Sequence, residues 1–297
     1  MNRPSPTAST IAVAPTVTVL STVASVRESV RAARASGDRI VLVPTMGALH
    51  AGHLALVDRA RELGETVIVS IFVNPLQFGA GEDLDRYPRT LDADLEALDP
   101  HGASFVFAPS VDEMYPTGAV ETRVSAGHVG SLYEGAARPG HFDGMLTVVA
   151  KLLGITQPDV AVFGRKDAQQ AFLVQQMVAD LNLATTIEVV PTVRELDGLA
   201  LSSRNRFLSD EQRLAAITLS EALRTAENTA FEGVAEVLAE AAGAFGDHDA
   251  VKLDYLVVVD PATFLPVDDD FRGPATVLVA ALVGETRLID NTTITLN

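Results

Sequence analysis

The strongest constraint on the fold is an apolar run at 40–43 (IVLV), which leads into PTMGALHAGH at 44–53 and then into a helical pattern. Four apolar residues of that pattern fall on one helical face: Leu56, Val57, Ala60 and Leu63. A buried strand, a turn with glycines and a helix start therefore meet in one short stretch. This strand–turn–helix unit is typical of α/β proteins.

The same alternation recurs along the N-terminal part of the chain. Apolar strands are expected at 66–74, 104–108, 160–163 and 186–193, and helices at 21–35, within 83–98, at 144–154 and at 168–181. The long section 110–143 has no clear period and is rich in glycine, so we expect an irregular, functional or disordered loop there. Strands that alternate with helices at this spacing predict a Rossmann-like, doubly wound parallel sheet.

The pattern changes after Ser209. Residues 209–245 are rich in Ala and Glu with helical periodicity, and three strands are expected close together at 251–260, 275–284 and 286–291. We therefore predict a disordered leader at 1–15, a Rossmann-like domain at 16–193 and a smaller α+β domain at 194–297.

Composition excludes several classes of function. The 297 residues carry a formal net charge of −17, which argues against a broad surface for nucleic acid or anionic membranes. No apolar run is long enough to span a bilayer, so no membrane partner is expected. The chain has no cysteine, which excludes disulfides and thiolate catalysis, and a cytoplasmic location is expected.

Polar clusters follow the predicted strands at 44–53, 74–77, 164–170 and 201–204. In a doubly wound sheet the carboxyl ends of the strands share one edge. We therefore expect these distant segments to converge on a single crevice.

The first cluster contains His50 and His53, three residues apart at the predicted helix start, so both rings can face the same side. Gly52 between them has no Cβ and lets a ligand approach the backbone. The unpaired N–H groups and the dipole of a helix start attract anions, above all phosphate. A single histidine is more often a solvated loop residue, but two of the six histidines in one such turn favour a nucleotide site.

The other clusters offer groups that suit a polyphosphate and a small polar substrate. Lys166 supplies a mobile positive charge, and 202–204 (SSR) supplies two hydroxyls and a guanidinium. Taken alone, SSR is more often a helix cap or a turn. Asn74, Gln77 and Gln170 are neutral amides that suit the hydroxyl and carboxylate groups of a substrate.

These motifs also carry a family resemblance. The segment 50–53 (HAGH) is similar to the HxGH signature of the nucleotidyltransferase superfamily, which is related to the HIGH motif of class I aminoacyl-tRNA synthetases. A wider set is more specific, with PTMGALHAGH, SIFVNPLQFG, DLDRYPRT, RPGHF, GRKDAQQ and DGLALSSRN in this order. Together, over residues 40–208, they closely resemble the pantothenate synthetase (pantoate–β-alanine ligase) family.

The resemblance implies an ATP-dependent ligase that works in two steps. The carboxylate of pantoate would attack the α-phosphate of Mg·ATP to give pantoyl adenylate and pyrophosphate. The amine of β-alanine would then displace AMP to give pantothenate. The expected small-molecule partners are therefore ATP, Mg²⁺, pantoate and β-alanine, and a homodimer is expected from the family alone.

The resemblance also assigns roles residue by residue. His50, His53 and Lys166 would be catalytic, with both histidines at the α-phosphate and His53 at the position usually assigned as proton donor. The expected ATP contacts are Met46, Gly47, His50, Gly52, His53, Gly164, Lys166, Asp167, Val193, Leu201, Ser202, Ser203 and Arg204. The expected substrate contacts are Gln77 and Gln170, with Asn74, Arg138 and His141 as weaker carry-overs.

The acidic candidate for Mg²⁺ is Asp94, together with Asp92, on the helix after YPRT. Mg²⁺ neutralises phosphate charge and needs few protein ligands. An ordinary solvated acidic face is an equally good interpretation of these two residues.

Three residues depart from the family pattern. Arg165 stands where an acidic residue is typical, Ala168 where a tyrosine is common and Asp143 where a basic residue is common. Because Arg165 and Asp143 exchange charge sign, they could compensate each other if their side chains lie close together.

Two other functions fit the motifs less well. An adenylyltransferase that transfers AMP to a phosphate should bring a second basic cluster, whereas the paired glutamines favour a carboxylate and hydroxyl substrate. A nucleotide-binding regulator without catalysis would not need the intact histidine pair and Lys166.

Overall fold

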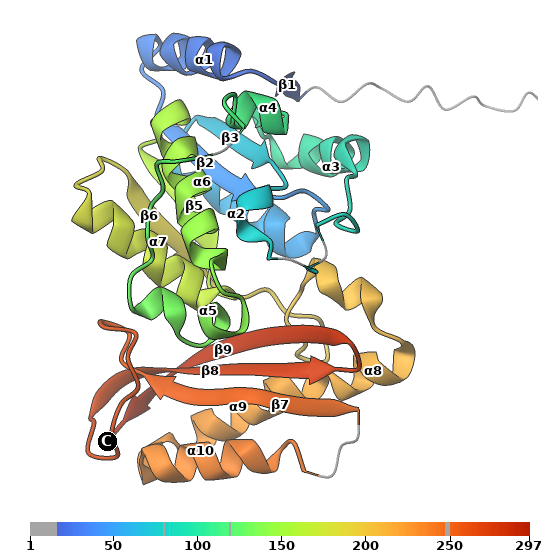
Figure 1. The fold of residues 1–297 in the computed structure, drawn as a ribbon, viewed down its shortest axis with the longest axis vertical. Helices are drawn as coiled ribbons and strands as arrows, with labels where there is room; N and C mark the ends of the chain where they lie inside the picture. Colours follow the sequence, from blue (N-terminus) through green and yellow to red (C-terminus); the bar gives the residue numbers. More distant parts are fainter. Residues whose placement is uncertain (1–16, 80, 83, 119, 247–249) are drawn as a thin grey trace, which may run out of the picture.

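The computed structural model describes residues 17–79, 81–82, 84–118, 120–246 and 250–297 (Figure 1). The leader predicted at 1–15 lies outside the described residues. A six-stranded parallel sheet forms the N-terminal part, and a three-stranded antiparallel sheet forms the smaller C-terminal part. The predicted fold class is therefore confirmed.

The parallel sheet has the strand order β1-β4-β3-β2-β5-β6. Its strands are β1 (Thr18–Leu20), β2 (Ile40–Thr45), β3 (Thr66–Ile71), β4 (Phe105–Phe107), β5 (Val160–Gly164) and β6 (Thr186–Val190). The helices of this part are α1 (Val23–Ala35), α2 (Ala51–Leu63), α3 (Leu91–Leu98), α4 (Val111–Met114), α5 (Glu134–Ala137), α6 (His141–Thr156) and α7 (Ala168–Asp180).

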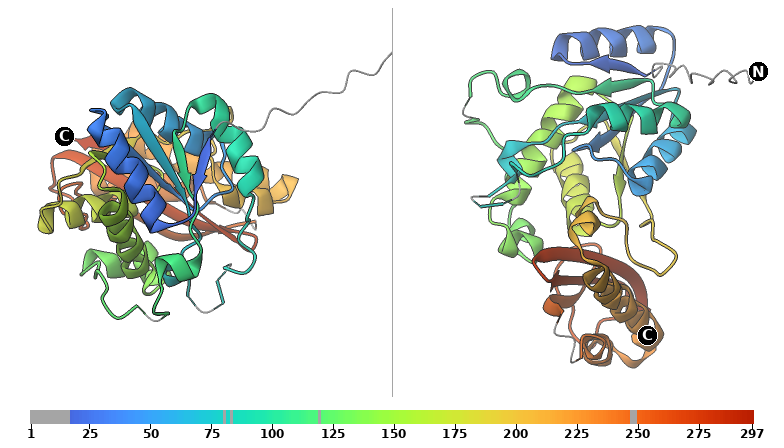
Figure 2. Two further views of the ribbon diagram at one scale, coloured as in Figure 1. Left: turned by 90° about the horizontal axis from the view of Figure 1, so that it is seen from above. Right: turned by 90° about the vertical axis from the view of Figure 1, so that its right-hand side faces the viewer.

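Helices cover both faces of this sheet because its strands are apolar on both sides (Figure 2). Along β2, Ile40 and Leu42 face the core formed with α1, α6 and α7. Val41 and Val43 face the opposite core, formed with α2 and α3. This alternation is what a period-two strand buried on both faces requires, and it produces the doubly wound arrangement.

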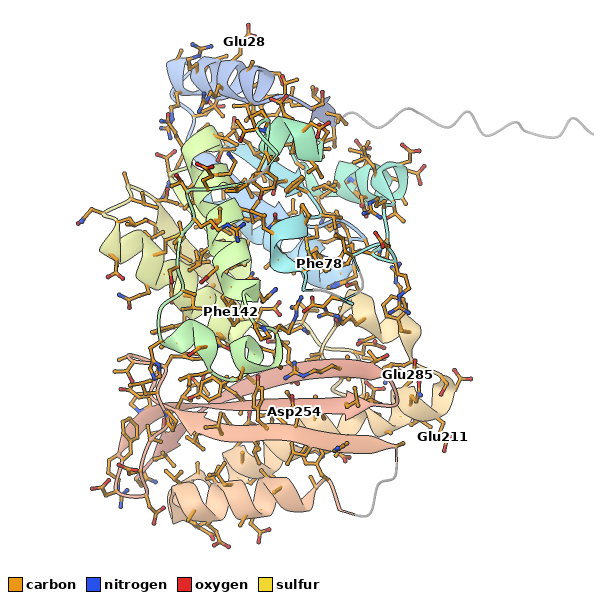
Figure 3. The ribbon with its side chains drawn as sticks, viewed as in Figure 1. Glu28, Phe78, Phe142, Glu211, Asp254 and Glu285 are labelled. Carbon is orange, nitrogen blue, oxygen red and sulfur yellow. The ribbon has the colours of Figure 1, made fainter. Side chains whose placement is uncertain are left out.

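The C-terminal sheet consists of β7 (Val251–Val259), β8 (Gly273–Val283) and β9 (Thr286–Leu296). The helices α8 (Asp210–Ala215), α9 (Ile217–Thr229) and α10 (Val234–Gly243) precede it, and α9 and α10 cover one of its faces. The other face lies against the N-terminal part, where Phe264 stacks on Phe172 of α7 at a centroid distance of 4.9 Å. Figure 3 shows Phe142 above this sheet, Asp254 on β7, and Glu285 in the turn between β8 and β9.

Four element ends differ from the prediction by three residues or more. β9 runs to Leu296 and not to 291, because it stays paired with β8 as far as Gly273. β3 ends at Ile71 and not at 74, because its pairing with β2 stops at Thr45 and the chain turns into a short 3₁₀ helix, Pro75–Gln77. β6 ends at Val190 and not at 193, because Pro191 has no N–H to donate to a ladder. α6 begins at His141 and not at 144, directly after Gly140, whose φ of +81° ends the preceding turn.

The section 110–143 was expected to be one irregular loop, but much of it is ordered into short elements. It contains α4, a 3₁₀ turn at Val129–Ser131 and α5, joined by turns. These short helices lack the length over which a periodic apolar stripe can be recognised.

No helix in the described ranges is long and apolar enough to cross a membrane.

Candidate active site

The candidate site lies where the winding of the sheet reverses. β2 and β5 are neighbours, yet the helix after β2 (α2) and the helix after β5 (α7) pack on opposite faces. Such a switch point is where open α/β sheets bind ligands. A pocket of about 230 Å³ opens there, and all four predicted polar clusters contribute to its wall.

Most of the predicted site residues line this pocket. They are Met46, His50, Gly52, His53, Gln77, Arg138, His141, Gly164, Lys166, Asp167, Gln170, Val193, Leu201, Ser202, Ser203 and Arg204. Gly47, Asn74 and Asp94 lie outside its wall.

His50 and His53 form the N-terminal cap of α2. The Nδ1 atom of His50 accepts a hydrogen bond from Gly52 N–H (3.1 Å), and Nδ1 of His53 accepts one from His50 N–H (3.3 Å). Because Nδ1 is an acceptor in both rings, a neutral ring must carry its proton on Nε2. Gly52 makes room for this cap, since a Cβ there would lie 2.9 Å from His50 Cε1.

Burial keeps both imidazoles neutral at pH 7. It lowers the pKa of His53 to about 3, with the adjacent His50 as the second cause. It also lowers the pKa of His50, where the charge of Lys166 is the second cause. The pair, with ring centroids 4.1 Å apart, therefore offers two N–H donors and no net charge. A neutral ring can donate a hydrogen bond from Nε2, and the proton-donor role expected for His53 stays a prediction.

Positive side chains line the same pocket. Lys166 lies in the turn between β5 and α7, with Nζ 3.9 Å from an oxygen of Asp167. Ser202 lines the pocket and also caps a 3₁₀ helix, Ser203–Phe207, by accepting a hydrogen bond from Arg204 N–H (3.2 Å). The two interpretations of SSR, as a cap and as part of a phosphate site, are thus compatible.

The segment 201–204 does not follow a strand of the parallel sheet, contrary to the prediction. It follows a short hairpin that an isolated bridge closes between Arg194 and Ala200. The N–H of Leu201 then donates to the carbonyl oxygen of Val193 (3.0 Å), which returns the chain to the pocket. A bridge this short leaves no apolar alternation in the sequence.

Asn74 is buried behind the pocket, and its surroundings define its orientation. Its Oδ1 accepts from the Tyr115 hydroxyl (2.7 Å) and from Leu76 N–H (3.3 Å), and its Nδ2 donates to the carbonyl oxygen of Gly144 (3.1 Å). Burial raises the pKa of Tyr115 to about 12, so the phenol remains a donor. Backbone groups on both sides therefore settle which atom of this amide is the oxygen.

The orientation of Asn74 in turn defines that of Gln77. Asn74 Nδ2 also donates to Gln77 Oε1 (3.0 Å), which leaves Gln77 Nε2 directed at Met46 Sδ (3.2 Å) in the pocket wall. The amide thus presents a donor to whatever occupies the pocket. Gly144 is needed for this packing, because a Cβ there would lie 2.1 Å from the carbonyl oxygen of Leu76.

Arg138 and His141 form one cluster with Glu82 at the pocket rim. Arg138 holds both carboxylate oxygens of Glu82 (3.1 and 2.5 Å). His141 Nε2 lies 3.2 Å from Arg138 Nη1, and because a guanidinium can only donate, the ring proton must be on Nδ1, 2.8 Å from the carbonyl oxygen of Gln77. Burial and then the charge of Arg138 lower the pKa of His141 to about 4, in accord with this neutral ring.

Asp94, the predicted metal candidate, bonds to the backbone of the loop before α2. Its two oxygens accept hydrogen bonds from Ala48 N–H (3.0 Å) and Leu49 N–H (2.8 Å). Gly47 (φ +83°) lies against the same carboxylate, where a Cβ would be 3.0 Å from Oδ2. The geometry thus gives Asp94 a structural role, and no group of three His, Cys, Asp or Glu in the described ranges is arranged to hold a metal.

The charge compensation suggested for Arg165 and Asp143 does not occur. Asp143 Oδ1 accepts from Ala126 N–H (2.7 Å), Arg165 is exposed, and no ion pair joins them in the described part of the chain. Ala168 packs in an apolar cluster with Phe172 and Phe264, between α7 and the C-terminal sheet.

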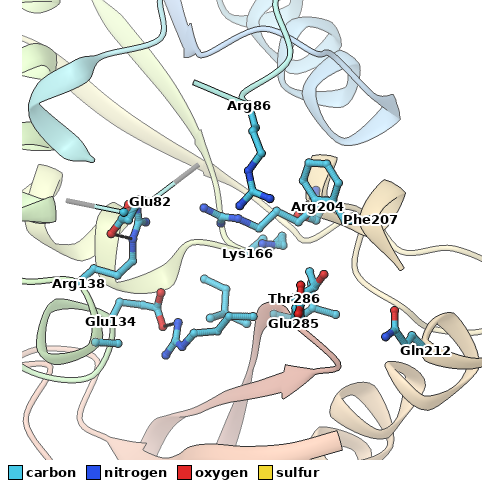
Figure 4. Close-up of a pocket in the computed structure, with 16 residues that line it drawn as sticks. Glu82, Arg86, Glu134, Arg138, Lys166, Arg204, Phe207, Gln212, Glu285 and Thr286 are labelled. Atoms are coloured by element: carbon cyan, nitrogen blue, oxygen red, sulfur yellow. Dashed lines mark hydrogen bonds and ion pairs between the residues drawn. The ribbon is translucent and has the colours of Figure 1, made fainter. Parts of the chain in front are cut away.

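Sequence reasoning missed the contribution of the C-terminal sheet. A second cavity of about 550 Å³ adjoins the pocket and shares Arg138, Lys166, Ser202 and Arg204 with it. Residues 285–289, at the start of β9, line its other wall (Figure 4). Sequence reasoning also missed Glu82 and Tyr115, whose roles depend on contacts between segments far apart in the chain.

Comparisons with known proteins agree on one family. The family model of pantoate-beta-alanine ligase matches residues 18–293. A pantothenate synthetase of Leifsonia xyli subsp. xyli is 62% identical over 278 residues, which cover 94% of this chain and 96% of the relative. One from Thermobifida fusca is 53% identical over 279 residues, which cover 91% of this chain and 94% of the relative.

Solved structures give the same result. The crystal structure of pantothenate synthetase from Thermus thermophilus superposes with a TM-score of 0.87 at 47% identity, covering 93% of this chain and 99% of that one. The Francisella tularensis ligase, solved in complex with beta-gamma ATP and β-alanine, has a TM-score of 0.76 at 35% identity, covering 93% and 97%. The chain therefore belongs to the pantoate–β-alanine ligase family, the pantothenate synthetases.

Proposed function

We propose that this pocket activates pantoate as its adenylate and then joins it to β-alanine, the reaction of the family. The observation that carries the proposal is the neutral pair His50 and His53, whose Nε2–H donors share one pocket with Lys166, Arg204 and the donor end of Gln77. Donors and cations that are already in place where negative charge develops are the main source of rate in nucleotidyl transfer.

In the first step, a carboxylate oxygen of pantoate bonds to the α-phosphorus of ATP, and the bond from that phosphorus to pyrophosphate breaks. The electron pair leaves with pyrophosphate, and no proton has to move. His50 and His53 therefore need only donate hydrogen bonds to the α-phosphate oxygens, which neutral rings can do. Lys166 and Arg204 are proposed to stabilise the charge on the departing phosphates.

In the second step, the amine of β-alanine attacks the carbonyl carbon of pantoyl adenylate. The bond from that carbon to AMP breaks, AMP leaves with the electron pair, and the amine gives up a proton to solvent. Holding both reactants in one crevice replaces a collision with a step inside the complex.

Gln77 and Gln170 are proposed to bind pantoate, with Gln77 donating from Nε2 to an oxygen of the substrate. Arg138 and His141 are proposed to act at the rim, where they hold the backbone carbonyl of Gln77. The remaining ATP contacts are proposed from Met46, Gly47 and Gly52, from 164–167, and from Val193 and 201–204. Asn74 acts through Gln77 and not on the substrate itself.

Magnesium is proposed to arrive as part of the Mg·ATP substrate, held by phosphate oxygens and water. The side chains that line the pocket of about 230 Å³ are cationic or neutral apart from Asp167, so they do not form an acidic metal site. We therefore assign no protein ligand to the ion. A cytoplasmic location is proposed from the lack of cysteine in the sequence, and a homodimer from the family resemblance. Light scattering after size exclusion tests the dimer.

Pantoate-dependent exchange of labelled pyrophosphate into ATP tests the proposal. Exchange should occur with ATP, Mg²⁺ and pantoate in the absence of β-alanine, because the adenylate forms before the amine is needed. A requirement for β-alanine in the exchange would contradict the two-step order.

A further inference from the structure

β9 lies at the side of the C-terminal sheet nearest the N-terminal part (Figure 1). Side chains alternate along it, as in any strand. Leu288, Ile294 and Leu296 belong to the core formed with α9 and α10, and Thr292 bonds to Glu227 of α9. Arg287 and Ile289, of the opposite parity, line the outer cavity, and the start of the strand also contributes Thr286 and Leu288 to it.

Asn291 belongs to this second set and contacts the turn that carries Lys166. Its Nδ2 donates to the carbonyl oxygens of Arg165 and Lys166, both at 2.9 Å, and the residue is only 4% exposed. The turn leads into α7 with no side-chain cap at Asp167. One amide group from the C-terminal sheet thus holds two successive carbonyls of the turn.

The preceding residue, Asp290, supports the other phosphate-site segment. Its carboxylate forms a two-pronged ion pair with Arg194, in which Oδ1 lies 3.0 Å from Nη2. Arg194 Nη1 also donates to the carbonyl oxygen of Gly198 (3.1 Å), and the bridge from Arg194 to Ala200 closes the hairpin before 201–204. Asp290 is buried and its carboxylate is paired, which is the condition for a stable buried charge.

We propose that Asp290 and Asn291 are positioning residues that hold Lys166 and the segment 201–204 in one arrangement for the phosphates of ATP. The proposal rests on the function proposed above for Lys166 and Arg204. Neither residue needs to touch a substrate. Lys166 is a point charge on a flexible stem, so the position of its backbone limits where that charge can lie.

The test compares two variants of the same strand. Asn291→Leu removes both donors to the turn, whereas Thr292→Val removes a hydrogen bond that faces α9 and serves as the control. The rate of pantoate-dependent pyrophosphate exchange is measured at varied concentrations of ATP and of pantoate. The melting temperature of each variant is measured as well. We expect Asn291→Leu to raise KM for ATP or lower kcat about tenfold while KM for pantoate stays within about twofold. Thr292→Val should leave all three constants unchanged.

The double variant with Lys166→Ala shows whether Asn291 acts through Lys166. If it does, Asn291→Leu adds little further loss in that background, whereas independent effects multiply. Asn291→Asp keeps the shape and gives a second variant that also lacks the donor. Asp290→Asn, which weakens the pair with Arg194, should likewise raise KM for ATP and not for pantoate.

Several results would overturn the inference. Exchange within about twofold of the parent in Asn291→Leu, multiplicative loss in the double variant, or an outright loss of folding in both Asn291 variants would each do so. If Lys166→Ala alone were as active as the parent, the role proposed for Lys166 would fail as well. The two failures are therefore distinguishable.

Discussion

The Nδ1 atom of His53 lies 3.3 Å from the backbone nitrogen of His50, so one histidine caps the helix turn that begins at the other. The cap explains why the pair can be neutral and yet directional. In each ring Nδ1 accepts a hydrogen bond from the backbone, and the Nε2–H group can donate to a ligand.

Replacing His53 by alanine should slow adenylate formation by about 10²–10³, the usual cost of one donor aimed at developing charge. The fold should survive, because the side chain lies at a ligand edge. His101→Ala is the matched control, since His101 pairs with Asp58 away from the pocket. Single-turnover rates with ATP and pantoate provide the measurement. A His53→Ala enzyme with the parent's rate would remove His53 from the mechanism.

Acidification should destabilise the chain through its half-buried histidines. The folded pKa values of His53 (about 3) and His141 (about 4) lie below the ordinary 6.5, so between these values the unfolded state binds more protons. Stability contributed by the neutral rings is thus present above about pH 6.5 and is lost as the pH falls.

Between pH 7 and pH 5 the loss should be about 2 kcal/mol for each ring, as an upper limit. Urea unfolding at the two pH values measures it, with His53→Asn as the comparison. The variant should lose less stability than the parent over this interval. Equal losses in both proteins would mean that His53 is not buried as a neutral ring.

The hydrogen bonds from Tyr115 to Asn74 and from Asn74 to Gln77 should affect KM for pantoate and not KM for ATP. Tyr115→Phe removes the hydroxyl that donates to Asn74 Oδ1, and a net hydrogen bond of about 1 kcal/mol corresponds to about a fivefold rise in KM for pantoate. Tyr133→Phe is the control, because its hydroxyl bonds to the backbone of Phe264. Steady-state kinetics with each substrate varied provide the measurement. An equal change in KM for pantoate and KM for ATP would mean that these hydrogen bonds do not orient Gln77.

Asp94→Asn should affect stability and leave the magnesium requirement unchanged. The substitution places an amide donor against one of two backbone N–H groups, a mismatch that costs about 1–3 kcal/mol in a buried site. Unfolding curves and a Mg²⁺ titration of the rate measure the two quantities. A much higher Mg²⁺ requirement with unchanged stability would restore Asp94 as a metal ligand.

The elements with a strong local signal were predictable. The strand at 40–43 and the helix face of Leu56, Val57 and Ala60 follow from the period of the apolar residues. The clusters 44–53, 74–77 and 164–170 follow from the rule that parallel strands share an edge, whereas 201–204 follows a hairpin. The residues at which strands end were less predictable, because the end of β3 depends on where β2 stops pairing with it.

The remaining parts of the site depend on contacts that no local pattern reports. Asn291 reaches Lys166 across 125 residues of chain, and Tyr115 reaches Asn74 across 41. For Asp94 the sequence left a metal ligand and an ordinary acidic residue both open. The structure adds that its carboxylate accepts two hydrogen bonds from the backbone, and its role as a metal ligand stays a prediction.

The most direct test of the central claim follows oxygen from pantoate into AMP. With ¹⁸O in the carboxylate of pantoate, attack on the α-phosphorus predicts that each AMP carries one labelled oxygen after β-alanine displaces it. Mass spectrometry of AMP and of pyrophosphate makes the measurement. Unlabelled AMP, or label in pyrophosphate, would contradict activation of pantoate at the α-phosphate in this pocket.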